Sequence, residues 1–580
     1  MPIIHQGDIH SHFDEVTSLN NVCPKNASAT NTTCYGGFAR AVAYGKHMAY
    51  RYRHPLNLNT GDFFQGHIYY SYFGWKLVAD VVTHMPYTAM VLGTQEFADG
   101  MQDLLSFMRR VGSKFLCTNY DLSQLNETLR AEFSKLCPRH RVLSVSEAAS
   151  RRQRMTVALL GYTTPEAKLL LQPGENIIFE DEVTALNREI ALILADPTYQ
   201  KKRDAFGRGI KVFVAIGHAG LERDREIAAQ VSSLDVIVGG HSHTLAWPGV
   251  WQNYLPMTPE DPADIAHDIY PVVVTQTSGR KVAIVHSGKH GKYMGVIDIG
   301  LNKDGEVRDW WPHIFLLKSS YPSDAEVEKI MEEYDRRLDG NRSEVIGHTR
   351  VLLAGSPEAC FAQECALGNL VAEAVLWVLR QHADSLRETV RMALVNAGAF
   401  SNGDIPAGDI TLGGILKAMP YQDTMTVVRM KGSTLLDTLD HSVGLAHTGG
   451  FLHLAGARLI ADWMAPPGRR AVSVSVSRGH SFEALNESAY YDVVVPAHVA
   501  DGGDGYRMVL EDAEPSDAVN VLDVDVMIRF FRAFHWVEPQ LDGRIIIMNP
   551  DGISRGARTQ VEQLVAVFVM VCGVAAAARW

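Results

Sequence analysis

Four short segments, far apart in the chain, place aspartate or histidine directly after apolar runs. They are GDIHSH (7–12), TGDFFQG (60–66), IGHAG (216–220) and GGHSHT (239–244). The apolar runs read as buried strands, and ligand sites in α/β sheets lie beyond the carboxyl ends of strands. We therefore expect an α/β fold in which Asp8, Asp62, His218 and His241 converge.

These residue types suit a metal ion. Carboxylate and imidazole groups on separate loops are typical ligands of Zn²⁺, Mn²⁺ or Mg²⁺. One D-x-H segment is weak evidence and one G-H-S-H segment is moderate evidence, but the ordered set indicates a metal site. The alternative is a group of buried histidines with a purely structural role, and the set as a whole makes that the weaker explanation.

The length of 580 residues predicts two or three domains. The N-terminal half alternates strand patterns, such as KFLCTN (114–119), TVALLGY and VFVAIGH, with helical patterns at 70–83, 100–111 and 224–231. Residues 323–338 predict a charged helix capped by Ser323, with one apolar stripe. The stripe contains Val327, Ile330, Met331 and Tyr334. We expect a metal domain at 1–318, a linker helix at 319–343, a second domain at 344–549, and a spacer with an apolar tail at 550–580.

The ordered Asp/His set resembles that of the calcineurin-like metallophosphoesterases. Four further segments extend the resemblance to the 5′-nucleotidase/apyrase family over nearly the whole chain: GKYMG (291–295), ECALGNLVAEAV (364–375), MKGSTLLDTLDHSV (430–443) and DGGDGYRM (501–508). The resemblance implies an N-terminal four-layer αββα metal domain, a joining helix, and a C-terminal α+β domain that holds the nucleoside. It also implies a domain rotation that carries substrate to the metals.

Carried over by motif, the resemblance implies two divalent ions, with Zn²⁺ favoured and Mn²⁺ or Mg²⁺ as alternatives. The first ion would be held by Asp8, His10, Asp62 and His243. Asp62 would bridge to the second ion, which His218 and His241 also bind. Two such ions polarise phosphoryl oxygens and generate hydroxide at neutral pH.

The resemblance also implies a nucleoside site, favouring a purine, in the C-terminal domain. Tyr421 and Tyr506 match the positions of two aromatic rings that stack on the base. Asp504 would hold the ribose hydroxyls, and Asn396 would hydrogen-bond the base. Taken alone, each tyrosine is better explained by a core or surface role, and its fit to the family motif reverses that weighting.

The segment GTQEFADG (93–100) departs from the family motif G-N-H-E-F-D. Thr94 stands in place of a metal-binding Asn, Gln95 in place of a His that stabilises the transition state, and Ala98 in place of the Asp that orients this His. Threonine offers only a neutral hydroxyl, and glutamine cannot carry a proton or a positive charge. We expect a weakened second metal site and weakened chemistry.

Two phosphate-binding arginines of the family are also replaced. Phe361 follows the first cysteine of the pair 360/365, and Ser401 ends the segment NAGAFS. Arginine forks are natural phosphate clamps, so a pocket without them holds a nucleoside better than a nucleotide.

Three functions remain open from the sequence. The first is metal-dependent hydrolysis of nucleoside 5′-phosphates, weakened by these replacements. The second is a pseudoenzyme that binds nucleosides or nucleotides, and the third and weakest is a surface-attached interaction protein. The net charge of −12 argues against a nucleic-acid partner. The oligomeric state is left open, with a homodimer as one candidate.

Several features indicate an extracellular protein. Six of the seven cysteines form the near pairs 23/34, 117/137 and 360/365, which favours short-loop disulfides over reduced thiols. Five N-x-S/T sequons, at Asn26, Asn31, Asn126, Asn341 and Asn486, agree with a glycoprotein.

The C-terminus resembles a GPI-anchor signal. Small residues at 552, 554 and 556 and a polar spacer at 555–563 precede an apolar run at 564–578. This run is shorter than the roughly 20 residues of a membrane span. A buried terminal helix is the alternative. No apolar leader precedes the first strand, so the chain is either cytosolic or begins before Met1 in its full form. The cysteines, sequons and tail favour the second, and hence a secreted or GPI-anchored protein.

Overall fold

A computed structural model defines most of the chain. It describes residues 1–17, 23, 33–52, 55–146, 154–171, 176–200, 212–249, 264–302, 307–382, 389–400, 403–419, 421, 423–479 and 481–548. Two compact units are present: Met1–Asn341 with Asp517–Asp525, and Arg342–Ser516 with Val526–Trp580. The predicted anchor signal, Ser401 and the sequons Asn26 and Asn31 lie outside the described residues.

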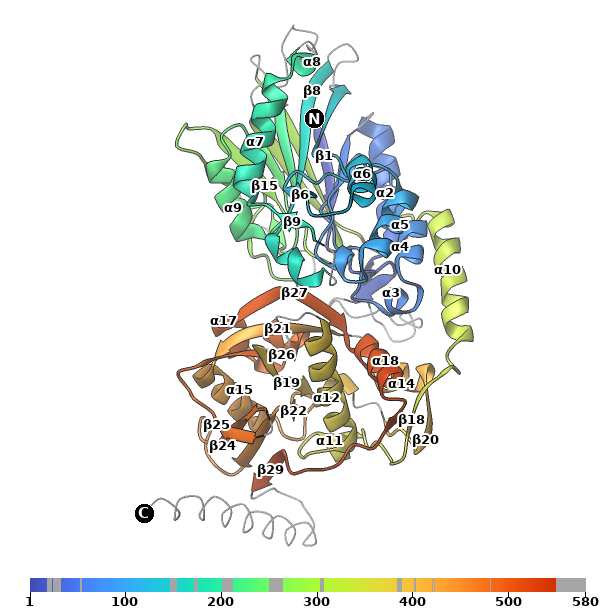
Figure 1. Cartoon of the computed structure of the whole chain (residues 1–580), viewed down its shortest axis with the longest axis vertical. Coiled ribbons are helices and arrows are strands. Elements are labelled where there is room, and N and C mark those ends of the chain that lie inside the picture. Colours follow the sequence, from blue (N-terminus) through green and yellow to red (C-terminus); the bar gives the residue numbers. More distant parts are fainter. Residues whose placement is uncertain are drawn as a thin grey trace. The chain divides into compact units, whose positions relative to one another are not determined.

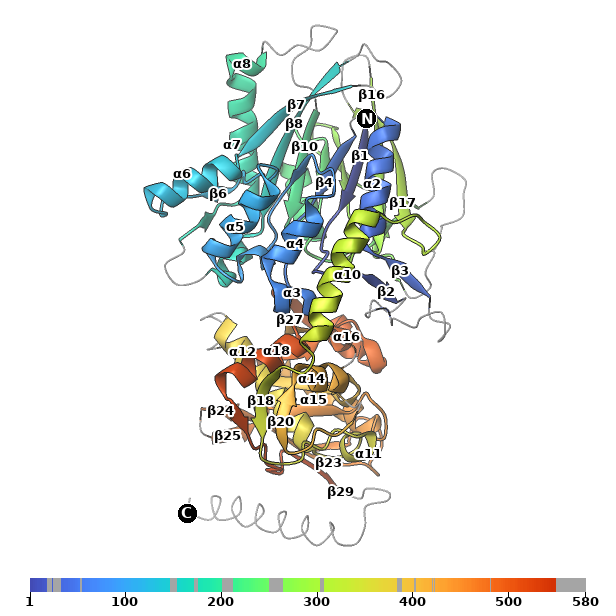
Figure 2. The ribbon, with the colours of Figure 1, turned by 90° about the vertical axis from the view of Figure 1, so that its right-hand side faces the viewer.

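Two sheets form the centre of the first unit (Figures 1 and 2). The first has the order β17 (Val307–Leu316), β16 (Tyr293–Leu301), β1 (Pro2–Gln6), β4 (Leu56–Asn59), β5 (Ala89–Met90). The second has the order β14 (Val272–Thr275), β15 (Lys281–Val285), β11 (Val236–Val238), β10 (Val212–His218), β8 (Arg154–Thr163), β7 (His140–Ser146). Strands β1, β4 and β5 run parallel, as do β8, β10, β11 and β15, so the carboxyl ends of the central strands share an edge in each sheet.

Successive side chains of a central strand point alternately to the core between the sheets and to the covering helices. In β10, Val212, Val214 and Ile216 face the core between the sheets, whereas Phe213 and Ala215 face the helices α7 (Glu182–Ala195) and α9 (Leu221–Gln230). Helices α2 (Phe38–Tyr52), α4 (Trp75–Val82) and α5 (Met101–Val111) cover the outer face of the other sheet (Figures 1 and 2). The expected four-layer αββα architecture is confirmed.

Two local expectations needed correction. The helix expected at 70–83 is split into α3 (Ile68–Phe73) and α4 by Gly74, whose φ of 60° is a left-handed conformation that ends a helix. The strand expected at 114–119 is reduced to an isolated bridge between Met90 and Phe115. An apolar run of this length does not show whether the segment forms a full β-strand or only a single β-bridge.

Helix α10 (Ala325–Gly340) lies in the first unit. Its N-cap is Asp324, which accepts from the Val327 amide, and not Ser323 as expected. The Ser323 hydroxyl instead contacts Glu328. A carboxylate at this position satisfies a free amide and interacts favourably with the positive end of the helix dipole. Val327, Met331, Tyr334 and Leu338 form the buried face, whereas Ile330 is only half-buried.

The second unit is an α+β assembly. Strands β22 (Leu452–Ala455), β19 (Val390–Asn396), β26 (Tyr490–Pro496) and β21 (Thr424–Lys431) lie side by side in that order, and α12 (Ala366–His382) packs on β19 and β22. A second sheet has the order β25 (Ser481–Ala484), β24 (Ala471–Arg478), β23 (Ala457–Asp462), β29 (Ile545–Met548). A small sheet contains β20 (Gly408–Thr411), β18 (Val345–Thr349) and β28 (Trp536–Val537). Further helices of this unit are α11 (Pro357–Cys360), α14 (Leu412–Ala418), α15 (Gly432–Gly444), α16 (Ala497–Ala500) and α17 (Arg507–Asp512).

The expected short-loop disulfides are present. They join Cys23 to Cys34, Cys117 to Cys137 and Cys360 to Cys365. Across the described ranges, none of the helices has the length and apolar character needed to cross a membrane.

Candidate metal centre

The Asp/His turns meet where the carboxyl ends of the central strands converge. Asp8 and His10 follow β1, and Asp62 follows the neighbouring parallel strand β4. The two loops are joined by hydrogen bonds from the Asp8 amide to the Gly61 carbonyl (3.0 Å) and from the His10 amide to the Asp62 carbonyl (2.9 Å). The first sheet therefore presents three potential ligands from two fused turns.

The second sheet supplies the remaining histidines. His218 ends β10, and its Nδ1 lies 2.6 Å from the Thr60 carbonyl oxygen of the first sheet's turn. The His241 amide, in the loop after β11, donates to Asp8 Oδ1 at 3.0 Å. These contacts fix the loops of both sheets against each other and leave His218 Nε2 facing Asp62 Oδ2 at 3.1 Å.

Two donor clusters result. Asp8, His10 and His243 place one donor atom each within 4.8 Å of one another, and so do Asp62, His218 and His241. Asp62 lies between the clusters, because its Oδ2 is also 3.8 Å from His10 Nε2. The arrangement brings together all six Asp and His residues that the sequence singled out.

The backbone at the centre is strained. Left-handed φ values, between 49° and 80°, occur at the residues Asp8, His10, Ser11, Asp62, His241 and His243. Such conformations cost a non-glycine residue about 1–3 kcal/mol each and persist where the surrounding structure enforces them, often at functional sites. The strain points the donors inward at the expense of stability.

Burial and proximity perturb the ionisation of these groups. Burial raises the pKa of Asp8 to about 6, although His218 opposes the shift. Burial would also raise the pKa of Asp62, but His218 and His10 outweigh it, and the net shift is downward. Burial lowers the pKa of His218, but Asp62 and Asp8 reverse this and raise it to about 10. The carboxylates therefore require a positive charge between them, which a proton on His218 or a cation can provide.

The second unit places its candidate residues around one loop, residues 446–450. The Gly398 amide, two residues after Asn396, donates to Gly449, and the His447 amide donates to the Phe361 carbonyl. Tyr506 is fully buried, and its hydroxyl donates to the Gly450 carbonyl at 2.6 Å. Tyr421, in contrast, is 52% exposed.

Asp504 has a partner within this unit. His498 Nε2 lies 3.3 Å from its carboxylate, and this hydrogen bond lowers the pKa of Asp504. Asn396 is nearly buried, and its Oδ1 has no hydrogen-bond partner among the described residues. In this conformation Tyr506 presents no open ring face, so the stacking role of this residue stays a prediction.

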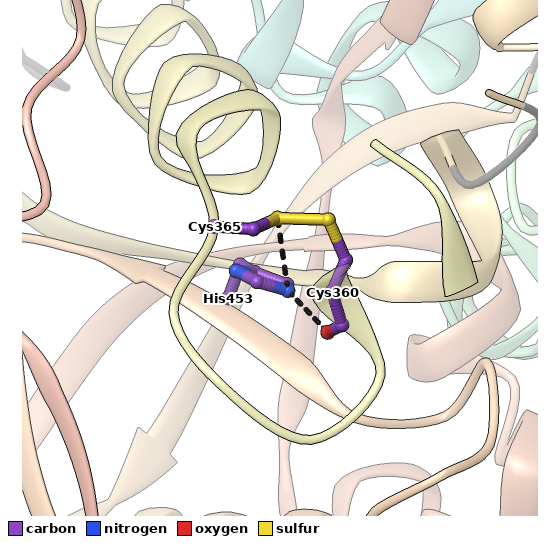
Figure 3. A group of neighbouring side chains, drawn as sticks. All are labelled: Cys360, Cys365 and His453. Atoms are coloured by element: carbon purple, nitrogen blue, oxygen red, sulfur yellow. Dashed lines mark hydrogen bonds between the residues drawn. A yellow bond between two sulfur atoms is a disulfide. The ribbon is translucent and has the colours of Figure 1, made fainter. Parts of the chain in front are cut away.

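A disulfide frames the loop that carries Phe361 (Figure 3). Cys360 and Cys365 are bonded, and the buried His453 from β22 lies against them, with its Nε2 2.9 Å from the Cys360 carbonyl oxygen. The half-buried Phe361 follows the first cysteine, and no basic side chain occupies its position.

Known proteins identify the two units. The family model described as "Calcineurin-like phosphoesterase" matches residues 1–245, and the one described as "5′-nucleotidase, C-terminal domain" matches residues 345–511. A 5′-nucleotidase of Bos taurus is 30% identical over 94% of this chain and 90% of its own length. A snake venom 5′-nucleotidase of Naja atra is 29% identical over 94% of this chain and 98% of its own length. The chain belongs to the 5′-nucleotidase family.

Solved structures of similar proteins agree with the fold. A 5′-nucleotidase precursor from Thermus thermophilus is 26% identical, covers 95% of this chain and 99% of its own, and superposes with a TM-score of 0.54. An NAD nucleotidase from Haemophilus influenzae superposes with a TM-score of 0.72 over 94% of this chain and 98% of its own; its 21% identity supports the fold alone.

The calcineurin-like fold of this 5′-nucleotidase family member implies divalent metal binding, and its donor set fits such ions. His10 Nε2 and His243 Nε2 approach to 3.0 Å, with the Asp62 carboxylate beside them. His218 Nδ1 contacts a backbone carbonyl, which orients Nε2 in the way that metal-binding histidines are commonly oriented. Asp8, His10 and His243 could hold one ion and His218 and His241 the other, with Asp62 between them.

The segment GTQEFADG lies against this centre. Gln95 begins the 3-10 turn η1 (Gln95–Phe97), and its amide donates to Asp62 Oδ1 at 2.9 Å. The side chains of Thr94 and Gln95 are fully buried, and within the described residues their polar atoms have no hydrogen-bond partners. Ala98 offers no polar group, and the nearby Asp99 carboxylate accepts from the Tyr70 hydroxyl at 2.6 Å.

Glu96 has a role that the sequence reasoning did not assign. Its buried carboxylate accepts hydrogen bonds from the amides of Gly93, Asp62, Phe63 and Phe64, at 2.6 to 3.1 Å. Burial, followed by repulsion from Asp62, raises the pKa of Glu96 to about 7. Glu96 therefore ties the GTQEFADG segment to the turn that carries the central ligand.

Three further histidines adjoin the centre and were also missed. The rings of His12 and His290 stack at 3.8 Å, His12 meets His67 edge to face at 5.2 Å, and all three are buried. His12 belongs to the quoted segment GDIHSH, whereas His290 lies one residue before the quoted segment GKYMG. The clustering of His12 with His290 depends on the pairing of β16 with β1, which no local pattern reveals.

Proposed function

We propose that this 5′-nucleotidase family member hydrolyses nucleoside 5′-phosphates to nucleoside and inorganic phosphate, with weakened activity. The observation that carries the proposal is the convergence of six buried Asp and His side chains in two clusters joined by Asp62. Two divalent ions bound there would polarise the phosphoryl oxygens and supply hydroxide at neutral pH. We favour Zn²⁺, with Mn²⁺ or Mg²⁺ as alternatives, because the donors are imidazole and carboxylate.

In this proposal the chain's own residues position the substrate and exclude water. Asp62 lies between the two ligand clusters and contacts a histidine of each. The strained turns at Asp8 and His10 direct the donor atoms inward. The second unit would bind the nucleoside, with Tyr421 and Tyr506 on the base, Asn396 at its edge and Asp504 on the ribose. For Asp504 to reach a ribose, its carboxylate would have to share or leave the contact with His498.

Weakening is proposed from the segment next to the metal centre. A His at position 95, oriented by an Asp at 98, would stabilise the transition state, whereas Gln95 and Ala98 cannot do so. Thr94 would be a poor ligand of the second ion. Loss of a positioned acid typically costs 10²–10⁴-fold in rate. Phe361 and Ser401 stand where the family resemblance implies phosphate-binding arginines.

A second candidate function is nucleoside or nucleotide binding without turnover. The buried side-chain amide of Gln95 favours it. This side chain lacks a hydrogen-bond partner among the described residues, and it cannot donate a proton as an acid.

We also propose an extracellular location. A snake venom protein is among the relatives, the described part of the chain contains three disulfides, and disulfides persist in oxidising compartments. Attachment through a C-terminal lipid anchor and assembly as a homodimer belong to the same proposal. A purine nucleotide is the favoured partner.

Phosphate release tests the proposal. The full chain, produced in a secretory host, is assayed with AMP, ADP and ATP in the presence of Zn²⁺ or Mn²⁺, and adenosine binding is measured in parallel. Turnover that EDTA and Asp62→Asn both abolish would support the hydrolase. Tight adenosine binding with no turnover would overturn it in favour of the binding protein.

A triple substitution tests the weakening. Thr94→Asn, Gln95→His and Ala98→Asp together should raise kcat by at least about tenfold, because they restore a ligand and an oriented acid. Gln95→Leu is the matched control, since it removes the amide without adding an acid and should give no gain. Equal rates for the triple variant and the parent protein would contradict the weakening argument.

A further inference from the structure

Two stacked imidazole rings lie against a candidate metal ligand. The rings of His12 and His290 have centroids 3.8 Å apart and planes inclined by 15°, and we call this pair the His12–His290 stack. The rings of His290 and His10 meet edge to face, with centroids 6.2 Å apart and planes at 89°. The stack therefore contacts the imidazole of His10, which belongs to the donor cluster with Asp8 and His243.

Both rings of the stack are tied to the turn that carries the candidate ligands. His12 Nδ1 donates to the His10 carbonyl at 2.9 Å, and the His12 amide donates to the Ile9 carbonyl at 3.0 Å. From the loop between β15 and β16, the His290 amide donates to the Asp8 carbonyl at 2.8 Å. Two separate segments of the chain thus hold the stack against residues 8–10.

The His290 ring offers its surface to its neighbours. His290 is buried, and its Nδ1 makes no hydrogen bond with the described residues. Its backbone is left-handed, with φ of 59°, as is that of the following Gly291, with φ of 65°. A strained position with an unpaired buried nitrogen costs stability, so the favourable contribution of this side chain comes from packing of its ring.

His10 lacks the contact that usually orients a metal-binding histidine. Such a histidine commonly forms a hydrogen bond through the ring nitrogen that does not bind the metal. His218 has this contact, with Nδ1 2.6 Å from the Thr60 carbonyl oxygen. His10 Nε2 faces His243 Nε2 at 3.0 Å, but its Nδ1 has no hydrogen bond of ordinary geometry among the described residues. The orientation of the His10 ring therefore depends on how the ring is packed.

The packing around His10 is close. A Cβ at Gly66 would lie 2.7 Å from His10 Cβ, so the backbone at Gly66 passes directly against this side chain. The His290 ring is in edge-to-face contact with the same side chain, and aromatic rings prefer stacked and edge-to-face geometries. A flat ring at position 290 can fix the rotation of a neighbouring ring, which an aliphatic side chain of similar volume cannot do.

We propose that the His12–His290 stack positions His10, holding its imidazole in the orientation from which Nε2 binds a divalent ion. The inference rests on the metal-binding part of the proposed function and is independent of hydrolysis. His12 and His290 are positioning residues, because they act through His10. The stack replaces, by ring packing, the hydrogen bond that orients His218 in the other donor cluster.

Zinc affinity of the full chain is the first readout. His290→Phe and His290→Leu form a matched pair, because both remove the ring nitrogens and fill the space but only phenylalanine keeps a flat ring. His290→Leu should weaken one of the two zinc-binding steps about tenfold or more, and His290→Phe should stay within about threefold of the parent protein. His47→Leu is the control, since it removes an exposed histidine of α2 and should change neither step.

Two further measurements separate positioning from simple filling of space. His10→Ala removes the candidate ligand itself, and the zinc-binding step that it weakens should be the step weakened in His290→Leu. The absorption spectrum of the cobalt-loaded protein reports ligand geometry, so it should change in His290→Leu and match that of the parent protein in His290→Phe. A side chain that only filled space would not distinguish leucine from phenylalanine.

Three results would overturn the inference in variants that unfold cooperatively in EDTA. They are unchanged zinc affinities in His290→Leu, an equal loss in His290→Leu and His290→Phe, and a loss at the step that His10→Ala does not affect. If His290→Leu does not fold, His12→Leu takes its place, because it removes the other ring of the stack and should weaken the same step.

The inference and the proposed function can fail separately. If the parent protein hydrolyses AMP and His290→Leu keeps both zinc affinities, the inference is wrong and the function stands. If the zinc affinities respond as expected but no nucleotide is hydrolysed, the inference stands and the hydrolase proposal is wrong.

Discussion

At the scale of single residues, Glu96 shows how one buried carboxylate organises a site without being a ligand. It accepts from four backbone amides, which belong to Gly93 and to the turn 62–64. Gly93 permits this close approach, since a Cβ there would meet Asp62 Oδ1 at 2.1 Å. Glu96 thus holds in place a segment in which Thr94, Gln95 and Ala98 stand where the family resemblance implies catalytic residues.

Glu96→Gln should destabilise the first unit by about 3 kcal/mol, because the new amide group opposes two buried backbone amides, each of which costs roughly 1–3 kcal/mol when unpaired. Thermal unfolding in EDTA measures this without interference from metal binding. Glu127→Gln, at an exposed position, is the control and should melt like the parent protein. A melting temperature of Glu96→Gln equal to that of the control would refute the anchoring role.

His453 predicts a pH dependence of stability. Burial beside the Cys360–Cys365 disulfide lowers its pKa from 6.5 to about 4. Between these values the unfolded chain binds a proton that the folded chain does not, so stability falls as the pH falls from 6.5 to about 4. The full loss is about 3 kcal/mol, and it is complete below the lower value.

His453→Gln should remove this part of the acid sensitivity, because glutamine keeps a donor for the Cys360 carbonyl but does not titrate. The check is the difference in melting temperature between about pH 7.5 and about pH 5 for the variant and the parent protein. His535→Gln, at an exposed position, is the control and should keep the parent dependence. An unchanged dependence in His453→Gln would show that this histidine is not buried in its neutral form.

The sequence predicted correctly that residues directly after certain strands lie close together, and their role as metal ligands stays a prediction. Asp8 and Asp62 follow strands of one sheet and His218 ends a strand of the other, and the three side chains meet where these strands end. The role of Glu96 could not be predicted, because it depends on two loops that meet across the fold. The burial of Tyr506 depends in the same way on the loop that ends at Gly450.

At the scale of elements, the apolar periodicity of the sequence predicted which helices and strands exist more reliably than it predicted the residues at which they begin and end. Helix α5 and strands β8 and β10 lie where apolar patterns predicted them. Helix ends depend on single hydrogen bonds instead, as in α10, where Asp324 and not the adjacent Ser323 accepts from the free amide. Two neighbouring cap-forming residues cannot be ranked by pattern alone.

Helix α6 (Glu127–Leu136) offers a test of such a cap. Its N-cap is Asn126, whose side chain accepts from the Leu129 amide at 2.9 Å and which is also the exposed acceptor of a sequon. Asn126→Ala should cost about 1 kcal/mol of stability through loss of the cap. Hydrogen exchange of the first turn of α6 reports this directly.

Asn126→Asp separates the cap from a glycan at the same residue. It removes the sequon but keeps an oxygen that can accept from Leu129, and a carboxylate also favours a helix N-terminus. Its α6 amides should therefore exchange as slowly as in the parent protein. If both variants exchange equally fast, the glycan and not the cap protects this turn.

At the scale of the whole molecule, the chain carries two folded units with separate cores. The length and the charged helix expected at 323–338 predicted a division into domains, because a single core rarely extends to 580 residues. The donor clusters belong entirely to the first unit, and Tyr421, Tyr506 and Asn396 to the second. Metal ions and nucleosides should therefore stabilise different parts of the molecule.

Metal removal tests this separation. A ligand that binds only the folded state adds stability that grows with its concentration, about 2.7 kcal/mol at a hundredfold excess over Kd. Zinc should raise the unfolding temperature of the first unit and EDTA should lower it, whereas adenosine should act on the second. Hydrogen exchange of β10 and β19 assigns each effect to a unit, because these strands lie in the cores of different units.

Asp62→Asn should abolish the zinc effect and leave the adenosine effect intact, since Asp62 lies between the two donor clusters. Equal protection of β10 and β19 by zinc alone would mean that the units unfold together, and the assignment of separate ligands to separate units would then be wrong.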